Sequence, residues 1–100
     1  MLVLKIQEVL TSNKHYAISR DATTILETLV KKSDQNGRCL VSIVYLTKEE
    51  GLFAHRVVDS IHQLRDVGIC ILVQGSIPDD YRQDFEIQIA SEYLQSNINK

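Results

Sequence analysis

Three histidines, His15, His55 and His62, are the side chains best suited to metal binding or proton transfer. His55 and His62 are seven residues apart, which on a helix places them on roughly the same face. Asp59 is the nearest further ligand, and a zinc site needs three or four convergent ligands. We therefore expect surface histidines and no metal site.

Two pairs of adjacent carboxylates, Glu49–Glu50 and Asp79–Asp80, are the remaining candidates for acid–base chemistry. Adjacent helical residues point apart, and negative charge at the start of a helix explains both pairs. No serine lies in a Gly-x-Ser-x-Gly elbow, and the four glycines form no phosphate-binding loop. The sequence predicts a protein that is not an enzyme and has no cofactor.

The elements that position these residues are expected between Cys39 and Pro78. Cys39–Leu46 is almost continuously apolar and rich in β-branched side chains, which predicts a strand covered on both faces. Thr47 begins a capping-box spacing, and Lys48–Asp66 has apolar residues at helical intervals. Gly68–Gln74 repeats the strand composition. Two such strands joined by a helix predict a parallel β-α-β unit with a right-handed crossover.

The flanking segments are expected to complete a single domain over residues 1–100. The predicted elements are a strand within 2–10, a helix from Ser19 or Asp21 to Lys32, a helix at 78–84, an edge strand at 85–89 and a helix from Ala90 to Ile98. The expected fold class is α/β. The domain would have a mixed four- to five-stranded sheet with a central parallel β-α-β unit and helices packed on it.

The segment Gly68–Pro78 resembles the strand and following turn of STAS domains, the sulfate-transporter and anti-sigma-factor-antagonist family. Gly68, Leu72, Gly75 and Pro78 match its hydrophobic strand and Gly-x-x-Pro turn. The resemblance implies a regulatory domain that binds a protein partner. The phosphorylated Ser or Thr of that family has no counterpart in Lys48–Leu52, so the resemblance does not imply the usual phosphorylation switch.

Charge and composition bear on partners and location. A net charge of −2 gives no electrostatic reason to expect nucleic acid or acidic lipid. No run approaches the roughly 20 apolar residues of a membrane span. Cys39 and Cys70 fall in expected core strands, and buried free thiols are consistent with a reducing cytoplasm. We expect a cytoplasmic domain that does not bind membranes.

The favoured function is a non-catalytic protein-interaction or regulatory module. Its partner would be another protein, or a second copy of the chain in a homodimer. The surface expected to bind it comprises Thr47, Glu49, Glu50, Leu52, Phe53, His55, Arg56, Asp59 and His62. The alternative for these residues is a solvated surface of mixed charge.

A winged-helix DNA-binding transcriptional regulator is the second hypothesis. Arg56–Ile69 has the spacing of a recognition helix, with wing strands at 69–74 and 85–89 around a tip at 76–83. Residues 40–46 would then have to be helical, although their composition disfavours a helix. The tip region also carries three aspartates against one arginine, which would repel phosphate. A strand at 40–46 favours the β-α-β fold, and a helix there favours the winged fold.

Overall fold

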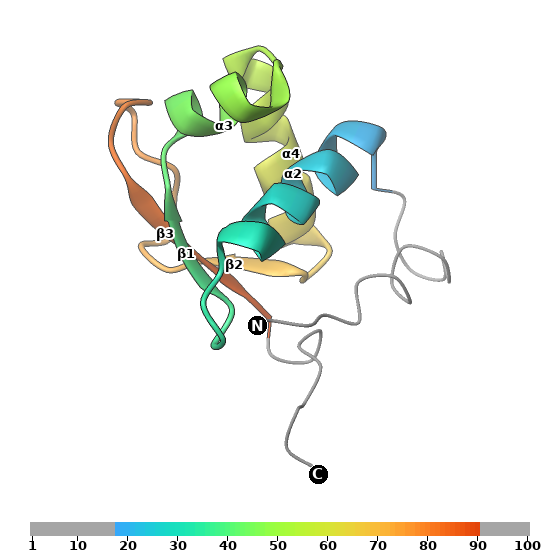
Figure 1. Ribbon diagram of the computed structural model, residues 1–100, viewed down its shortest axis with the longest axis vertical. Helices are drawn as coiled ribbons and strands as arrows, with labels where there is room; N and C mark the ends of the chain where they lie inside the picture. The colour runs from blue at the N-terminus through green and yellow to red at the C-terminus, as the bar shows by residue number, and fades with distance from the viewer. Residues whose placement is uncertain (1–17, 91–100) are drawn as a thin grey trace, which may run out of the picture.

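The computed structural model of the chain describes residues 18–90 (Figure 1). The elements are α2 (Arg20–Lys32), β1 (Arg38–Val41), α3 (Ile43–Glu50), α4 (Ala54–Asp66), β2 (Cys70–Leu72) and β3 (Phe85–Ile89). The strand expected within 2–10 and most of the helix expected at 90–98 lie outside the described residues. No helix within residues 18–90 has the length and apolar character needed to cross a membrane.

The sheet of the described region has three strands in the order β1-β3-β2, and both pairings are antiparallel. Val41 lies opposite Phe85, and Leu72 lies opposite Ile87. The two strands that were expected to be parallel neighbours are therefore separated by β3. The predicted parallel β-α-β unit and the mixed four- to five-stranded sheet are wrong.

The structure first departs from the predicted β-α-β unit at Ser42, which lies within the stretch expected to be one strand. Its hydroxyl accepts a hydrogen bond from the Tyr45 backbone N–H at 3.0 Å, so Ser42 is the N-cap of α3. Ile43 and Leu46 lie three residues apart on one face of α3 and are completely buried. Burial of this face outweighs the weak helix propensity of the β-branched residues.

The long helix expected over Lys48–Asp66 is also wrong, because Gly51 ends α3 and α4 begins only at Ala54. Gly51 has φ +67°, the left-handed conformation that a helix C-cap often requires, and its N–H donates to the Thr47 carbonyl at 2.8 Å. Thr47 thus lies in the last turn of α3 and caps no helix start. Its hydroxyl donates instead to the Val44 carbonyl.

Three other predictions can be compared with the structure. The helix capped by Ser19 is confirmed as α2, since the Ser19 hydroxyl accepts the Ala22 N–H at 3.0 Å. The strand at 85–89 is confirmed as β3, but it is central and not at an edge. The helix expected at 78–84 is absent from this described stretch, where the Asp80 carboxylate accepts the Arg82 N–H and closes a turn.

The helices pack on one face of the sheet, and the core lies between these two layers (Figure 1). Alternate residues of the strands point into it, including Cys39, Cys70 and Ile87, while Leu40 and Ile71 are exposed on the opposite face. Both cysteines are free and buried, as expected. Because β3 separates their strands, the two cysteine Cα atoms lie two strand spacings apart, roughly 10 Å, which is too far for a disulfide bond.

The described elements follow the order helix, strand, helix, helix, strand, strand, and the last strand is central in the sheet. The helices α3 and α4, joined by the three-residue turn Gly51–Phe53, form a helix-turn-helix unit. In the winged-helix hypothesis Arg56–Ile69 is the recognition helix; α4 covers most of that range, and residues 73–84 connect β2 to β3.

Candidate functional site

The nine residues predicted to bind a partner are distributed over the helix-turn-helix unit and do not lie on one helix. Thr47, Glu49 and Glu50 end α3, Leu52 and Phe53 form the turn, and His55, Arg56, Asp59 and His62 belong to α4. The most exposed of them is Phe53, whose exposed fraction is 71%. Glu49, His55, Arg56 and Asp59 are exposed, and the other four are half-buried.

An aromatic pair marks the start of α4. The rings of Phe53 and His55 are stacked, with centroids 6.1 Å apart and planes 10° from parallel. Phe53 is the N-cap residue of α4 but forms no side-chain capping hydrogen bond. The exposed ring therefore does not contribute to helix capping and is available for contact with a partner.

Arg56 contacts another part of the domain. Its guanidinium donates two hydrogen bonds to the Asp21 carboxylate, at 2.8 and 2.9 Å, and so joins α4 to α2. The hydrogen bond to Asp21 raises the pKa of Arg56. Glu50 is similarly engaged, because its carboxylate accepts a hydrogen bond from the Thr28 hydroxyl of α2. These two side chains hold the helices together.

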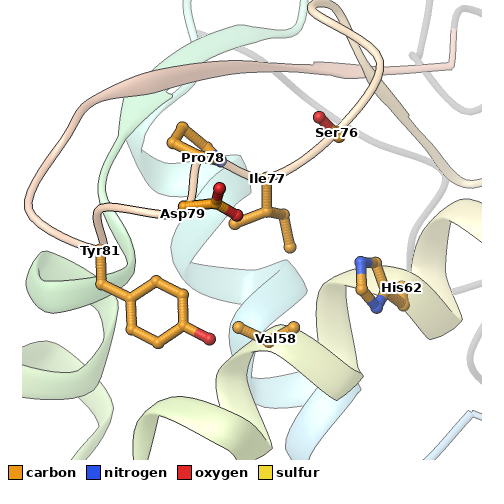
Figure 2. Close-up of a pocket in the computed structure, with 7 residues that line it drawn as sticks. All are labelled: Val58, His62, Ser76, Ile77, Pro78, Asp79 and Tyr81. Carbon is orange, nitrogen blue, oxygen red and sulfur yellow. The ribbon is translucent and has the colours of Figure 1, made fainter.

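The segment between β2 and β3, residues 73–84, lies beside α4, and we call it the wing loop. The Val44 N–H at the start of α3 donates to the Tyr81 carbonyl at 3.0 Å and holds the loop beside the helices. Figure 2 shows Ile77 and Tyr81 directed from the loop toward Val58, with His62 further along α4. Val58 and Ile77 are half-buried against the core.

A groove of about 320 Å³ lies between α4 and the wing loop. Its lining residues are Val58, His62, Ser76, Ile77, Pro78, Asp79 and Tyr81 (Figure 2). A second hollow of about 560 Å³ lies along the wing loop itself, lined by Gln74, Ser76, Pro78, Asp79, Asp80, Gln83, Asp84 and Phe85. The first has more apolar than polar surface, whereas in the second the two are nearly equal and three of the eight lining residues are aspartates.

The wing loop carries three carboxylates and one guanidinium. Arg82 pairs with Asp80 at 3.2 Å, and hydrogen bonds from the Arg82 backbone and side chain lower the pKa of Asp80. Within residues 18–90, Asp79 and Asp84 have no cationic partner. The loop therefore presents two carboxylates that no charge of the described region neutralises.

The structure brings together some site residues that the sequence reasoning did not assign. Val58, Ile77 and Tyr81 were given no role in binding. The available signal was their composition, since apolar side chains in a segment otherwise rich in turn and acidic residues need contacts of their own. In the described part of the chain, His, Cys, Asp and Glu side chains form no cluster able to hold a metal ion.

Comparison with protein-family models, curated proteins and solved structures gave no significant match to the chain. The resemblance to STAS domains therefore stays a prediction. The β-α-β unit predicted from the residue pattern is not formed, as described above.

Proposed function

We propose that this chain is a non-catalytic interaction module built on a winged-helix scaffold, acting in the cytoplasm. Its partner is another protein, which contacts the exposed face of α4 and the wing loop. This proposal keeps the function favoured by the sequence but assigns it to a different fold and a partly different surface.

The proposal is carried by one observation, the chemistry of the face on which a helix-turn-helix protein reads DNA. That face is formed by the first turns of the second helix. Here it presents Phe53, His55, Val58, Asp59 and His62, and the one arginine in these turns, Arg56, is bound to Asp21. The first turns of α4 therefore offer bases and phosphates no unpaired lysine or arginine, the side chains that most often recognise them.

The charge of the surrounding segment agrees with this interpretation. Residues 43–84, which span the helix-turn-helix unit and the wing loop, contain seven acidic and four basic residues, for a net charge of −3 with neutral histidines. All three arginines are ion-paired: Arg56 with Asp21, Arg65 with Asp66 and Arg82 with Asp80. Binding to the DNA backbone relies on unneutralised basic side chains, so this surface opposes it.

The same surface has the composition of a protein interface. Aromatic side chains are enriched in interfaces, and here Phe53 and Tyr81 are exposed by 71% and 41%. The helix-turn-helix unit and the Val44–Tyr81 hydrogen bond fix the backbone at both positions before a partner binds. A partner would therefore lose little free energy to ordering this surface.

The test is affinity capture from the source lysate with three variants of the full chain. We expect a protein bound by the wild-type chain to be lost with Phe53→Ala and with Asp59→Lys. It should be retained by Glu27→Lys, a matched charge reversal at an exposed position of α2. Circular dichroism would show that each variant is folded. Equal capture by all variants would contradict the proposal.

DNA binding is the second candidate, favoured by the order of the elements and by the three-residue turn between α3 and α4. It predicts an electrophoretic shift of duplex DNA that weakens steeply with salt. The shift should be abolished by His55→Ala and by Arg82→Ala. Such a result, together with no protein partner, would replace the interaction proposal.

A further inference from the structure

We infer that the partner presents an extended segment in which an apolar side chain adjoins a lysine or arginine. This inference rests on the proposed interaction function and specifies the chemistry of the partner. The segment crosses the wing loop at Ser76–Asp79, which we call the ridge, and places one side chain on each side of it.

The groove on the α4 side of the ridge accepts the apolar side chain. Val58, Ile77 and Tyr81 supply its apolar surface, and Figure 2 shows these three side chains converging from the helix and the loop. Val58 and Ile77 are half-buried, so part of their apolar surface still contacts solvent. Covering this surface favours association through the hydrophobic effect.

The hollow on the other side of the ridge accepts the basic side chain. Asp79, Asp80 and Asp84 line it, and no lysine or arginine is among its lining residues. Arg82 pairs with Asp80, which leaves Asp79 and Asp84 without a cationic partner in residues 18–90. A guanidinium or ammonium group placed here meets the complementary charge.

The two hollows adjoin the same short segment, because Ser76, Pro78 and Asp79 line both of them. One segment can therefore fill both with neighbouring side chains. A small-molecule ligand fits less well, since sites for small molecules enclose most of the ligand surface. Here Ser76, Asp79 and Tyr81 of the groove are themselves exposed, which is typical of an open surface for a peptide.

The first experiment pans a random-sequence peptide library displayed on phage against the full chain. We expect the selected peptides to share a Leu, Ile, Phe or Tyr next to a Lys or Arg. One selected peptide is then synthesised with a fluorescent label, together with versions in which the basic residue is Glu or the apolar residue is Ser. Fluorescence anisotropy should show binding of the parent peptide and at least roughly tenfold weaker binding of both versions.

Variants of the full chain then locate the peptide. Asp79→Lys and Val58→Lys should each weaken binding of the parent peptide by roughly tenfold or more. Glu27→Lys, on the exposed surface of α2, should bind the peptide as the wild-type chain does. The effect of Asp79→Lys should shrink at high salt, because exposed charge interactions are screened, whereas the effect of Val58→Lys should persist.

Several results would overturn the inference. Selected peptides without basic residues, or equal binding by Asp79→Lys, would show that the second hollow is not used. A dimer of the chain that Tyr81→Lys converts to a monomer would make a second copy the occupant. One such result is that the phage library yields no binding peptide while affinity capture finds a protein partner that is lost with Phe53→Ala. That result would reject this inference and leave the interaction function intact. A salt-sensitive DNA shift without a protein partner would reject both.

Discussion

Gly51→Ala is a sensitive test of the helix-turn-helix unit, because the sign of its effect depends on the fold. In the structure Gly51 has φ +67°, and a Cβ atom added there would meet no atom within 4 Å. Steric overlap with neighbouring elements therefore adds nothing to the cost of the substitution. The only cost is that alanine must adopt the left-handed backbone conformation. That conformation costs about 1–2 kcal/mol for a residue with a Cβ.

Part of this cost is offset in the unfolded chain. Alanine restricts the unfolded backbone more than glycine does, which stabilises the folded state by about 0.4–1 kcal/mol. The net expectation is a loss of about 0–1.6 kcal/mol in the free energy of unfolding. If residues 48–66 formed one continuous helix, the same change would stabilise the protein by about 1 kcal/mol.

The assay is urea unfolding of the full chain followed by circular dichroism. Gly51→Asn is the matched control, since asparagine tolerates the left-handed region better than alanine, and it should be less destabilising than Gly51→Ala. Glu27→Gly, within the exposed face of α2, calibrates an ordinary helix position and should cost about 1 kcal/mol. Stabilisation by Gly51→Ala would refute the turn at Gly51–Phe53.

Three further predictions concern the core. Ile61→Ala should lower the free energy of unfolding by about 2–4 kcal/mol, because Ile61 is completely buried in α4; a loss below about 0.5 kcal/mol in urea unfolding would mean that α4 faces the sheet differently. Burial raises the pKa of the Cys39 thiol to about 11 and that of Cys70 to about 12, from an ordinary value of 9.0. Both thiols should therefore react with Ellman's reagent at pH 8 only after unfolding, and rapid reaction of the native chain would contradict their burial. The thiols of the unfolded chain ionise at lower pH than those of the folded chain. The contribution of the protonated thiols to the free energy of unfolding should therefore be fully present below about pH 9 and be lost as the pH rises toward 11–12. Melting temperatures at about pH 7–11 would measure this loss.

The sequence predicted the elements whose signals are local. Ser19 before an apolar helical pattern predicted α2, and the alternation Phe85, Ile87, Ile89 predicted β3. Both signals lie within the element itself. They did not depend on which segments pack together.

The sequence did not predict the division of residues 39–66 into β1, α3 and α4. Ser42 and Gly51 are the residues at which the chain changes conformation, but each also fits a continuous strand or helix. What decides between them is burial of Ile43 and Leu46 and the hydrogen bond from Val44 to Tyr81, far along the chain. Such contacts are tertiary, and intrinsic propensity is a weak guide where they dominate.

The candidate site, too, was predicted only where local sequence patterns indicate it. The exposed positions His55 and Asp59 were found from helical spacing, but the 71% exposure of Phe53 was not. Arg56 has the same spacing but is bound to Asp21, a pairing between two helices that no local pattern indicates. The wing-loop half of the groove depends on the turn at Asp80, which the sequence reasoning had assigned to a helix.

The central position of β3 also determines when the domain can fold during synthesis. Both β1 and β2 pair only with β3 in the described sheet, although β3 is the last of the three to be made. Until Phe85–Ile89 has left the ribosome, the two earlier strands have no partner, and the apolar face of the helices has no sheet to cover it. Chains that stop before Phe85 should therefore expose this surface and be directed to chaperones or proteases.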